Sequence, residues 1–457
     1  MNSEKPVNFI SCYMLRLMRH MKYRIRNASM SEEIRLKTSQ ISGFYKLSVK
    51  ERAQIVKEFA GLTDDAVRIL QSTGSLNLEL ADRMIENVVG AIPIPLGIAV
   101  NFLINGKDYL IPMAIEETSV VAAASYGAKM TRSKGGIFTS STDPVMIGQI
   151  QTIKVKDPYR AKMAILEAKD EILEKANEQD PMLVSVGGGA KDLRAKVIHT
   201  VRGPMVITEL LVDCRDAMGA NAVNTMAEAV APIIERITGG QVILRIISNL
   251  ATERLARAWT VVSKEAVGGE EVVDGILDAY AFAAADPYRA ATHNKGILNG
   301  IIGVVIATCN DHRAVEAGAH AYASRTGHYS PLSVWEKNED GDLVGSLELP
   351  MAVGIIGGAT KVHPVAKVAL KILGVKTARE LSEVMAAVGL AQNLAALRAL
   401  AHEGIQRGHM SLHARNIAIM AGATGELIDV IAERMVKERK IRMDRAKELL
   451  EEYQRKT

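Results

Sequence analysis

The chain of 457 residues has few cysteines, few aromatic residues and no long apolar segment. Cys12, Cys214 and Cys309 are isolated, so no CxxC pair is available for a structural zinc cage, and no disulfide framework is indicated. Aromatic residues are 4% of the chain, which argues against stacking platforms for single-stranded nucleic acid. The most apolar run, 91–100, is broken by prolines and is shorter than the roughly 20 residues of a membrane span. We therefore expect a cytoplasmic protein with no membrane or nucleic-acid partner.

Several common cofactor and catalytic motifs are also missing. No GxGxxG follows a strand, and GxxxxGK[ST], HExxH and GxSxG do not occur. His409 and His413 stand four apart but lack a matching carboxylate helix, so we expect ordinary polar histidines and no metal site. A nucleotide cofactor would therefore need a loop that is not of the Rossmann type.

The basic excess is concentrated at the start of the chain. The net charge is +4, and residues 1–29 alone hold six basic residues against one acidic residue. An even basic footprint for nucleic acid is therefore excluded. This leader fits an amphipathic surface helix, a transit-like peptide, a poorly packed extension or a start codon placed too early, with Met30 as the conventional beginning. We expect it to lie outside the fold.

The order of elements predicts an α+β protein. Residues 49–90 are expected to be helical, 301–307 read as a strand-like apolar run, 333–335 and 343–349 form a hairpin candidate, and about the last 55 residues are charged and helical. Between them, strands are expected at 149–157, 193–201, 204–213 and 241–248, with helices at 158–178 and 222–238. The resulting βαββαβ order is that of a ferredoxin-like domain inserted into a larger one.

Four short segments combine residue types that carry chemistry. The loop 212–221 joins a predicted strand to a predicted helix, where Gly219 and the helix N-terminus suit a pyrophosphate, although a plain structural turn is the commoner explanation. Segments 115–119, 289–299 and 308–311 gather carboxylates, Arg, Lys and Asn, and each also fits ordinary loop polarity. A lysine buried beside two carboxylates would be a recognised device for proton transfer.

Six motifs in order give the chain a family resemblance over about residues 40–457. They are Glu86–Gly97, Glu116–Ala124, Asp216–Asn221, Thr292–Gly296, Gly354–Lys361 and Gly408–His413. Together they resemble 3-hydroxy-3-methylglutaryl-coenzyme A (HMG-CoA) reductase in its soluble class II form, although that family has no leader like residues 1–29. The resemblance implies a large substrate-binding and dimerisation domain (30–141 and 253–402), an inserted NAD(P)-binding domain (142–252) and a C-terminal helical lid (403–457).

The resemblance also implies the site residues. By their match to the family motifs, the catalytic residues are Glu117, Lys295, Asp311 and His409; the substrate-binding residues are Arg289, Ser119, Thr292 and Asn299; and the cofactor-binding residues are Asp180, Asp216, Met218, Gly219 and Asn221.

The implied reaction converts HMG-CoA to mevalonate and coenzyme A with two hydrides from a nicotinamide cofactor, at a site shared by two subunits. An acidic residue before the glycine run 187–189 marks NADH users among class II relatives, so Asp180 predicts NADH over NADPH, although Lys191 and Arg194 could reverse this. The alternative is a CoA-thioester hydrolase without redox chemistry.

Overall fold

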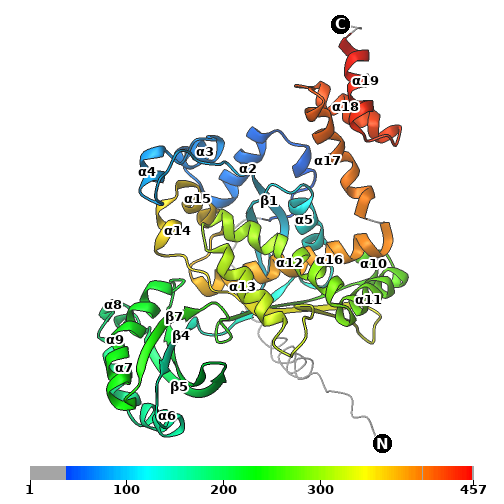
Figure 1. Cartoon of the computed structure of the whole chain (residues 1–457). Helices are drawn as coiled ribbons and strands as arrows, with labels where there is room; N and C mark the ends of the chain where they lie inside the picture. The colour runs from blue at the N-terminus through cyan, green and yellow to red at the C-terminus, as the bar shows by residue number, and fades with distance from the viewer. Residues whose placement is uncertain (1–37, 404, 455–457) are drawn as a thin grey trace, which may run out of the picture. The chain divides into compact units, whose positions relative to one another are not determined.

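The computed structural model describes residues 38–403 and 405–454 of the chain, with side chains described for 38–402 and 413–453. The leader, 1–29, lies outside the described residues. Figure 1 shows the course of the chain and the labels used below.

Short capped helices begin the described part of the chain. They are α2 (Val49–Ala60), α3 (Asp64–Gln71) and α4 (Leu78–Asp82). At the start of α2 the Ser48 hydroxyl accepts a bond from the Glu51 backbone, and the Glu51 carboxylate accepts one from the Ser48 backbone, which forms a capping box. The helical prediction for 49–90 is therefore confirmed as far as Asp82. Residues 83–95 contain no helix or strand.

A hairpin then leads into the segment 115–119. Its strands are β1 (Leu96–Ile104) and β2 (Lys107–Ala114). Asn105 and Gly106 turn the chain with φ of 50° and 80°, the left-handed conformation that a two-residue Asn-Gly turn requires. Helix α5 (Val120–Thr131) starts directly after the segment, so 115–119 is a short connection held between two partly buried elements.

A four-stranded antiparallel sheet organises the larger part of the chain. Its order is β3 (Phe138–Ser141), β8 (Leu255–Val262), β10 (Leu343–Pro350) and β9 (Ser333–Lys337). The pairing of β9 with β10 confirms the predicted hairpin. Strands β3 and β8 are neighbours in the sheet although more than a hundred residues separate them in the chain. The intervening residues therefore form an excursion that leaves this sheet and returns to it.

That excursion forms a second four-stranded sheet, in the order β5-β6-β4-β7. Its strands are β4 (Val145–Ile153), β5 (Gly189–Thr200), β6 (Gly203–Asp213) and β7 (Gln241–Ser248), and its helices are α6 (Pro158–Glu167), α7 (Lys169–Asn177), α8 (Pro181–Ser185) and α9 (Ala220–Thr238). Helices α6, α7 and α9 contact one another and the sheet (Figure 1). The predicted βαββαβ order is present, but the helix expected at 158–178 is two helices that meet at Ala168, and β5 begins four residues early.

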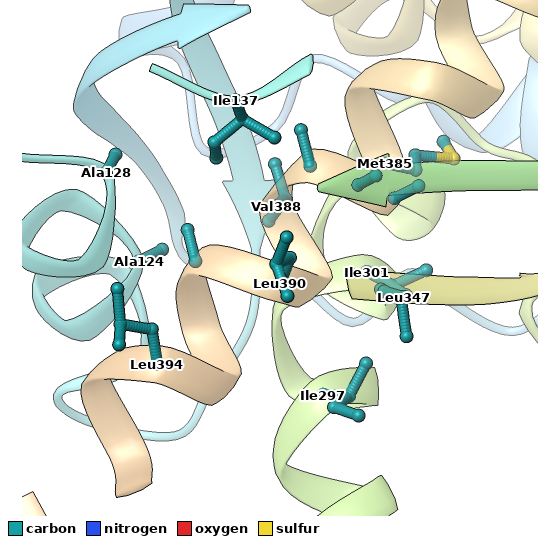
Figure 2. Close-up of a cluster of buried hydrophobic side chains, with 14 of the residues drawn as sticks. Ala124, Ala128, Ile137, Ile297, Ile301, Leu347, Met385, Val388, Leu390 and Leu394 are labelled. Atoms are coloured by element: carbon teal, nitrogen blue, oxygen red, sulfur yellow. The ribbon is translucent and has the colours of Figure 1, made fainter. Parts of the chain in front are cut away.

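Helix α16 (Ala378–Arg398) lies at the centre of the largest hydrophobic core. It contacts α5, α12 (Pro287–Ala307) and β8. Figure 2 shows Leu394 of α16 facing Ala124 of α5, with Ile297 of α12 in the same cluster. By length and composition, the helical stretch 378–402 is the one segment in the described chain that could span a membrane, but 72% of its most apolar window is buried inside the protein. Core burial accounts for that composition.

The prediction of a strand-like run at 301–307 is wrong, because these residues form the last two turns of α12. The run is rich in Ile and Val, which favour strands. Its large buried residues, Ile301, Val304 and Val305, are spaced three and four apart and pack in the core, and Gly303 and Ala307 are buried as well. Tertiary packing therefore overrides the local preference.

The remaining helices complete the described fold. They are α10 (Lys264–Val267), α11 (Glu270–Ala285), α13 (His312–Ala323), α14 (Gly358–Val362), α15 (Pro364–Leu373), α17 (Ile405–Met420), α18 (Leu427–Lys437) and α19 (Met443–Gln454), with short turns η1 (Phe44–Lys46), η2 (Arg132–Lys134) and η3 (Ala399–Glu403). Helices α17, α18 and α19 share a hydrophobic core of their own, which includes Ile431, Met435 and Leu449. The expected C-terminal helices are thus present in the described residues.

Candidate active site

The structure brings Glu117 and Lys295 together although 178 residues separate them. Glu117 comes from the connection between β2 and α5, and Lys295 projects from α12. The Lys295 Nζ donates to Glu117 Oε2 at 2.7 Å, and the Asn299 amide lies 3.4 Å from the same oxygen. The two ionic side chains keep 58% and 41% of their surface exposed. A cation and a carboxylate are therefore held in contact where a ligand can reach both.

The polar residues of the segment 289–299 lie on two different faces of α12. Thr292, Lys295 and Asn299 lie three and four residues apart, so they share the face that carries the ion pair. His293 and Asn294 point the other way and are buried. The Asn294 amide accepts from the Leu332 backbone and donates to the Ser330 carbonyl, so it fixes the helix to the segment before β9. Only the first set is available to a ligand.

Arg289, in the first turn of α12, holds a half-buried positive charge. Its backbone N–H is capped by Asp286 at 2.8 Å, but no ion pair or hydrogen bond involves its guanidinium among the described residues. Burial lowers its pKa, and an arginine stays protonated regardless. A guanidinium whose N–H donors have no described carboxylate partner is suited to binding a carboxylate on a ligand.

Ser119 is strained and incompletely bonded. It has φ of 72°, a conformation that residues other than glycine rarely adopt, and its buried Oγ has no hydrogen-bond partner among the described residues. Glu117 and Ser119 both line a pocket of about 1140 Å³, together with η1, α2 and the start of β1. A buried hydroxyl beside a pocket that is large enough for an extended ligand indicates a binding role.

Asp311 lies at the N-terminus of α13 and caps it. Its carboxylate accepts from the backbone N–H groups of Arg313 and Ala314 and from the Arg313 side chain, at 3.1 to 3.2 Å. Burial raises the pKa of Asp311, but these hydrogen bonds outweigh it and hold the pKa below its usual range. Within the described residues no hydrogen bond or ion pair joins Asp311 to Lys295 or Glu117. The side chain of His409 lies outside the described residues.

The predicted cofactor loop has the geometry of a tight turn into a helix. β6 ends at Asp213, as the sequence predicts, and α9 starts at Ala220, two residues earlier than predicted. Gly219 has φ of 104°, and an added Cβ would lie 2.3 Å from the Cys214 sulfur, so only glycine fits there. Asn221 is exposed in the first turn of α9. The backbone of Asp216 accepts from Ile355 at 2.9 Å and its carboxylate accepts from Ala378 at 2.8 Å, so the loop is held by the larger part of the chain.

Asp180 and the glycine run 187–189 lie against this loop. The Asp180 carboxylate caps α8 by accepting from the Leu183 backbone at 2.9 Å. A Cβ on Gly187 would lie 2.4 Å from the Arg215 guanidinium, and a Cβ on Gly188 would lie 2.8 Å from the Asp213 carbonyl. The glycines thus permit α8 and the end of β6 to pack closely, and the charge of Asp180 acts on Cys214 at the start of the loop.

Two further features of the site carry no sequence motif. Arg254 is buried where the excursion rejoins the larger sheet, and its guanidinium contacts the carbonyl oxygens of Ala217 and Met218. Asn310 pairs in two directions with the backbone of Gly354, at 2.8 and 3.1 Å. Asn310 belongs to the polar segment 308–311, but its pairing with Gly354 could not be predicted, and a single arginine such as Arg254 gives no signal from sequence alone. Within the described residues, no group of three or more His, Cys, Asp or Glu side chains could hold a metal ion.

Comparisons with known proteins agree with this arrangement. The family model described as hydroxymethylglutaryl-coenzyme A reductase matches residues 48–414. The chain is 65% identical over 417 residues to 3-hydroxy-3-methylglutaryl-coenzyme A reductase of Archaeoglobus fulgidus, which covers 91% of this chain and 95% of that protein. It is 36% identical to the probable reductase of Borreliella burgdorferi, over 82% of this chain and 85% of that one.

Solved structures of related enzymes share the fold of this chain. The reductase of Streptococcus pneumoniae matches with a TM-score of 0.78 and 40% identity, over 90% of this chain and 99% of that chain. The class II enzyme of the same organism, in open conformations bound to NADPH, matches with a TM-score of 0.76 over 89% and 100%. The mixed α/β fold is therefore that of class II reductases. The chain belongs to the hydroxymethylglutaryl-coenzyme A reductase family, and its function is the nicotinamide-dependent reduction that this family contributes to the mevalonate pathway.

Proposed function

We propose that the ion pair of Lys295 and Glu117 is the reacting centre of this reductase, with Asp311 and His409 as the other catalytic residues. The observation that carries the proposal is the 2.7 Å contact between Lys295 Nζ and Glu117 Oε2 beside the large pocket. Asp311 has no described contact with the pair, so its assignment rests on the family resemblance. The same is true of His409.

The nicotinamide cofactor supplies the two hydrides when it is bound. In the first reduction, negative charge develops on the thioester oxygen, and the Lys295 ammonium stabilises it by donating a hydrogen bond. His409, as an imidazolium, protonates the departing coenzyme A thiolate. In the second reduction, Glu117, which is 41% exposed, first takes up a proton from solvent and then gives it to the oxygen that becomes the alcohol of mevalonate. The 2.7 Å contact supports this sequence, because a carboxyl so close to the ammonium faces the same substrate oxygen.

The substrate is proposed to bind along the exposed face of α12 and the strained connection 115–119. The guanidinium of Arg289, which has no described partner, takes the free carboxylate of the hydroxymethylglutaryl group. Thr292 and Asn299 lie on the Lys295 face and the orphaned Ser119 Oγ completes the polar contacts. The adjoining pocket is large enough to hold part of the coenzyme A chain.

The inserted domain, residues 142–252, is proposed as the NAD(P)-binding domain. The residues of the loop fit such a ligand: the N-terminus of the 19-residue helix α9 presents free N–H groups to a pyrophosphate, and Gly219 lets the turn before it pack against Cys214. Asp216, Met218 and Asn221 belong to the same turn. Residues 30–141 and 253–402 then form the substrate domain and 403–457 a lid that delivers His409.

Cofactor preference is proposed to be for NADH, with NADPH as the alternative. The Asp180 carboxylate lies near the loop and would repel a 2′-phosphate while accepting a bond from a ribose hydroxyl. Of the cations near the glycine run, Arg194 is paired with Glu253 at 2.9 Å and Arg215 with Asp213 at 3.7 Å, which leaves Lys191 as the remaining attraction for a phosphate. The related enzyme solved with NADPH favours the alternative, so a direct comparison of the two cofactors is required.

A second copy of the chain is proposed to complete the site. Residues 83–95, which carry a family motif, expose several large apolar side chains: Ile85, Val89 and Ile92 are 66%, 99% and 92% exposed. Exposed apolar clusters commonly mark interfaces between subunits. We expect a dimer or a multiple of dimers, and a cytoplasmic location.

Steady-state reduction of HMG-CoA tests the reacting centre. Lys295→Ala is expected to lower kcat at least about a hundredfold, the usual effect of removing one electrostatic donor. Lys175→Ala is the matched control, because it removes an exposed Lys–Glu pair of similar length, 2.8 Å, on α7. Near-normal turnover of Lys295→Ala would refute the assignment. Release of coenzyme A without oxidation of NADH or NADPH would instead favour a thioester hydrolase.

A further inference from the structure

Arg254 is a buried arginine at the junction between the inserted domain and the larger sheet. It immediately precedes β8 and is 4% exposed. Its Nη1 donates to the carbonyl oxygens of Ala217 and Met218 at 3.1 and 3.0 Å, and its Nη2 donates to that of Val353. One guanidinium therefore joins the loop between β6 and α9 to the segment that follows β10.

The surroundings explain why this cation is tolerated inside the protein. Burial lowers the pKa of Arg254, and the negative charges of Asp213 and Asp216 act against that effect. Its planar fork satisfies three carbonyl groups at once, which a lysine cannot do in the same geometry. Since burying a charge is costly unless it is well bonded, an arginine here indicates a specific demand for those bonds.

Backbone contacts from the two residues that follow Val353 hold the same stretch of loop. The Ile355 N–H donates to the Asp216 carbonyl at 2.9 Å. A Cβ on Gly354 would lie 2.6 Å from the Met218 nitrogen, so the two backbones are in close contact. Gly354 is in turn paired with Asn310, the neighbour of Asp311. The loop is thus fixed in shape and in its position against the segment that holds a proposed catalytic carboxylate.

We propose that Arg254 is a positioning residue for the nicotinamide cofactor, which holds the Asp216–Asn221 loop in its binding shape through the carbonyls of Ala217 and Met218. The inference rests on the proposed function of that loop. A loop that is already ordered loses less conformational entropy when a ligand binds, so Arg254 acts on cofactor affinity without touching the cofactor.

The test measures cofactor and substrate parameters separately in the full-length enzyme. Arg254→Met keeps much of the buried volume and removes every donor, and Arg254→Lys keeps the charge but not the fork. We expect Arg254→Met to raise both the KM and the Kd of the reduced cofactor about tenfold or more, with a smaller rise for Arg254→Lys. The Kd of HMG-CoA and the kcat at saturating cofactor are expected to stay within about threefold. Arg245→Lys is the matched control, since that exposed arginine also donates to a backbone carbonyl.

A second variant reaches the loop without altering the buried charge. Gly354→Ala places a methyl group against the Met218 nitrogen and is expected to raise the cofactor KM in the same way. If the Arg254 variants do not fold, Gly354→Ala alone tests the proposal. A variant set in which cofactor and HMG-CoA binding weaken equally, or in which neither changes, overturns the proposal.

Asn221→Ala separates the failure of this inference from the failure of the proposed function. If Asn221→Ala raises the cofactor KM while the Arg254 and Gly354 variants leave it unchanged, the loop binds the cofactor and Arg254 does not position it. If none of these variants changes the cofactor KM, both the loop assignment and the role of Arg254 are wrong.

Discussion

A buried histidine on α12, the helix that carries Lys295, is expected to make the protein sensitive to mild acid. His293 of α12 is 2% exposed, and its Nε2 lies 2.7 Å from the Ser333 hydroxyl. That hydroxyl donates to the Asn393 side-chain oxygen at 2.9 Å, as does the Trp335 indole at 2.7 Å. The Asn393 amide nitrogen, a donor, lies 3.2 Å from the same Nε2, so this ring nitrogen faces both a hydroxyl and an amide N–H group. The other ring nitrogen, Nδ1, has no partner within the described residues.

Protonation would place a charge and an unsatisfied N–H group in this site. Burial, and secondarily the charge of Arg289, lower the pKa of His293 from 6.5 to about 4. The unfolded chain therefore binds this proton first as the pH falls. Stability that is present above pH 6.5 is lost as the pH falls towards 4, where the loss is complete. The expected decrease in the free energy of unfolding is about 2 kcal/mol between pH 7.5 and 5.0, and about 3 kcal/mol in full.

Urea denaturation at pH 7.5 and 5.0 measures this effect in the wild type and in His293→Gln. The variant is expected to be less stable at pH 7.5, since it loses packing and hydrogen bonds, but to lose about 2 kcal/mol less than the wild type on acidification. Comparing the acid-induced loss of stability in the wild type with that in the variant cancels the contribution of other titrating groups such as His363. His320→Gln is the control, because that histidine is exposed and bonded to Tyr329. An identical acid-induced loss in wild type and His293→Gln would refute the reasoning.

Three further predictions concern the proposed site. Asp311→Asn keeps a side chain that can cap α13 but removes the charge, so kcat is expected to fall at least about tenfold while the melting temperature changes little; equal losses in both would indicate a structural role only. Asp180→Asn likewise keeps the cap on α8, and it is expected to lower the KM for NADPH relative to that for NADH; an unchanged ratio would remove Asp180 from cofactor selection. His409→Gln is expected to impair reduction of HMG-CoA while sparing that of free mevaldehyde, which has no thiolate to protonate, and equal losses on both substrates would contradict its role as proton donor.

The inserted domain could be predicted from sequence because its signals are local. Pro158 begins a charged helix, Gly239 ends another, and β4, β6 and β7 are largely apolar, whereas the longer β5 carries several charged residues. What the sequence could not give was the break at Ala168, because the residues on both sides favour helix equally. The pairing of β8 with β3 could not be predicted either, since strand pairing across a hundred residues depends on the whole fold.

The candidate site was predictable in its residues but not in its contacts. Glu117, Lys295 and Arg289 are identified through the family motifs, and their separation in the chain hides the 2.7 Å pair between the first two. The contact depends on the packing of α12 against α16 and β2. This packing places Lys295 opposite the connection 115–119. The present bonding of Asp311 to α13 is likewise a property of the fold.

The segment 289–299 shows why the sequence overstates the size of a site. Its polar residues read as one cluster, but a helix places residues on different faces every few positions. Lys295 and Thr292 lie on the face that carries the ion pair with Glu117, whereas His293 and Asn294 bond to Ser333 and Ser330 at and before β9. His293 and Asn294 hold α12 in place, and the opposite face of this helix carries Lys295. The position of Lys295 therefore depends on the buried contacts of His293 and Asn294. Acid that protonates His293 is therefore expected to disturb the Lys295–Glu117 contact before the rest of the fold is lost.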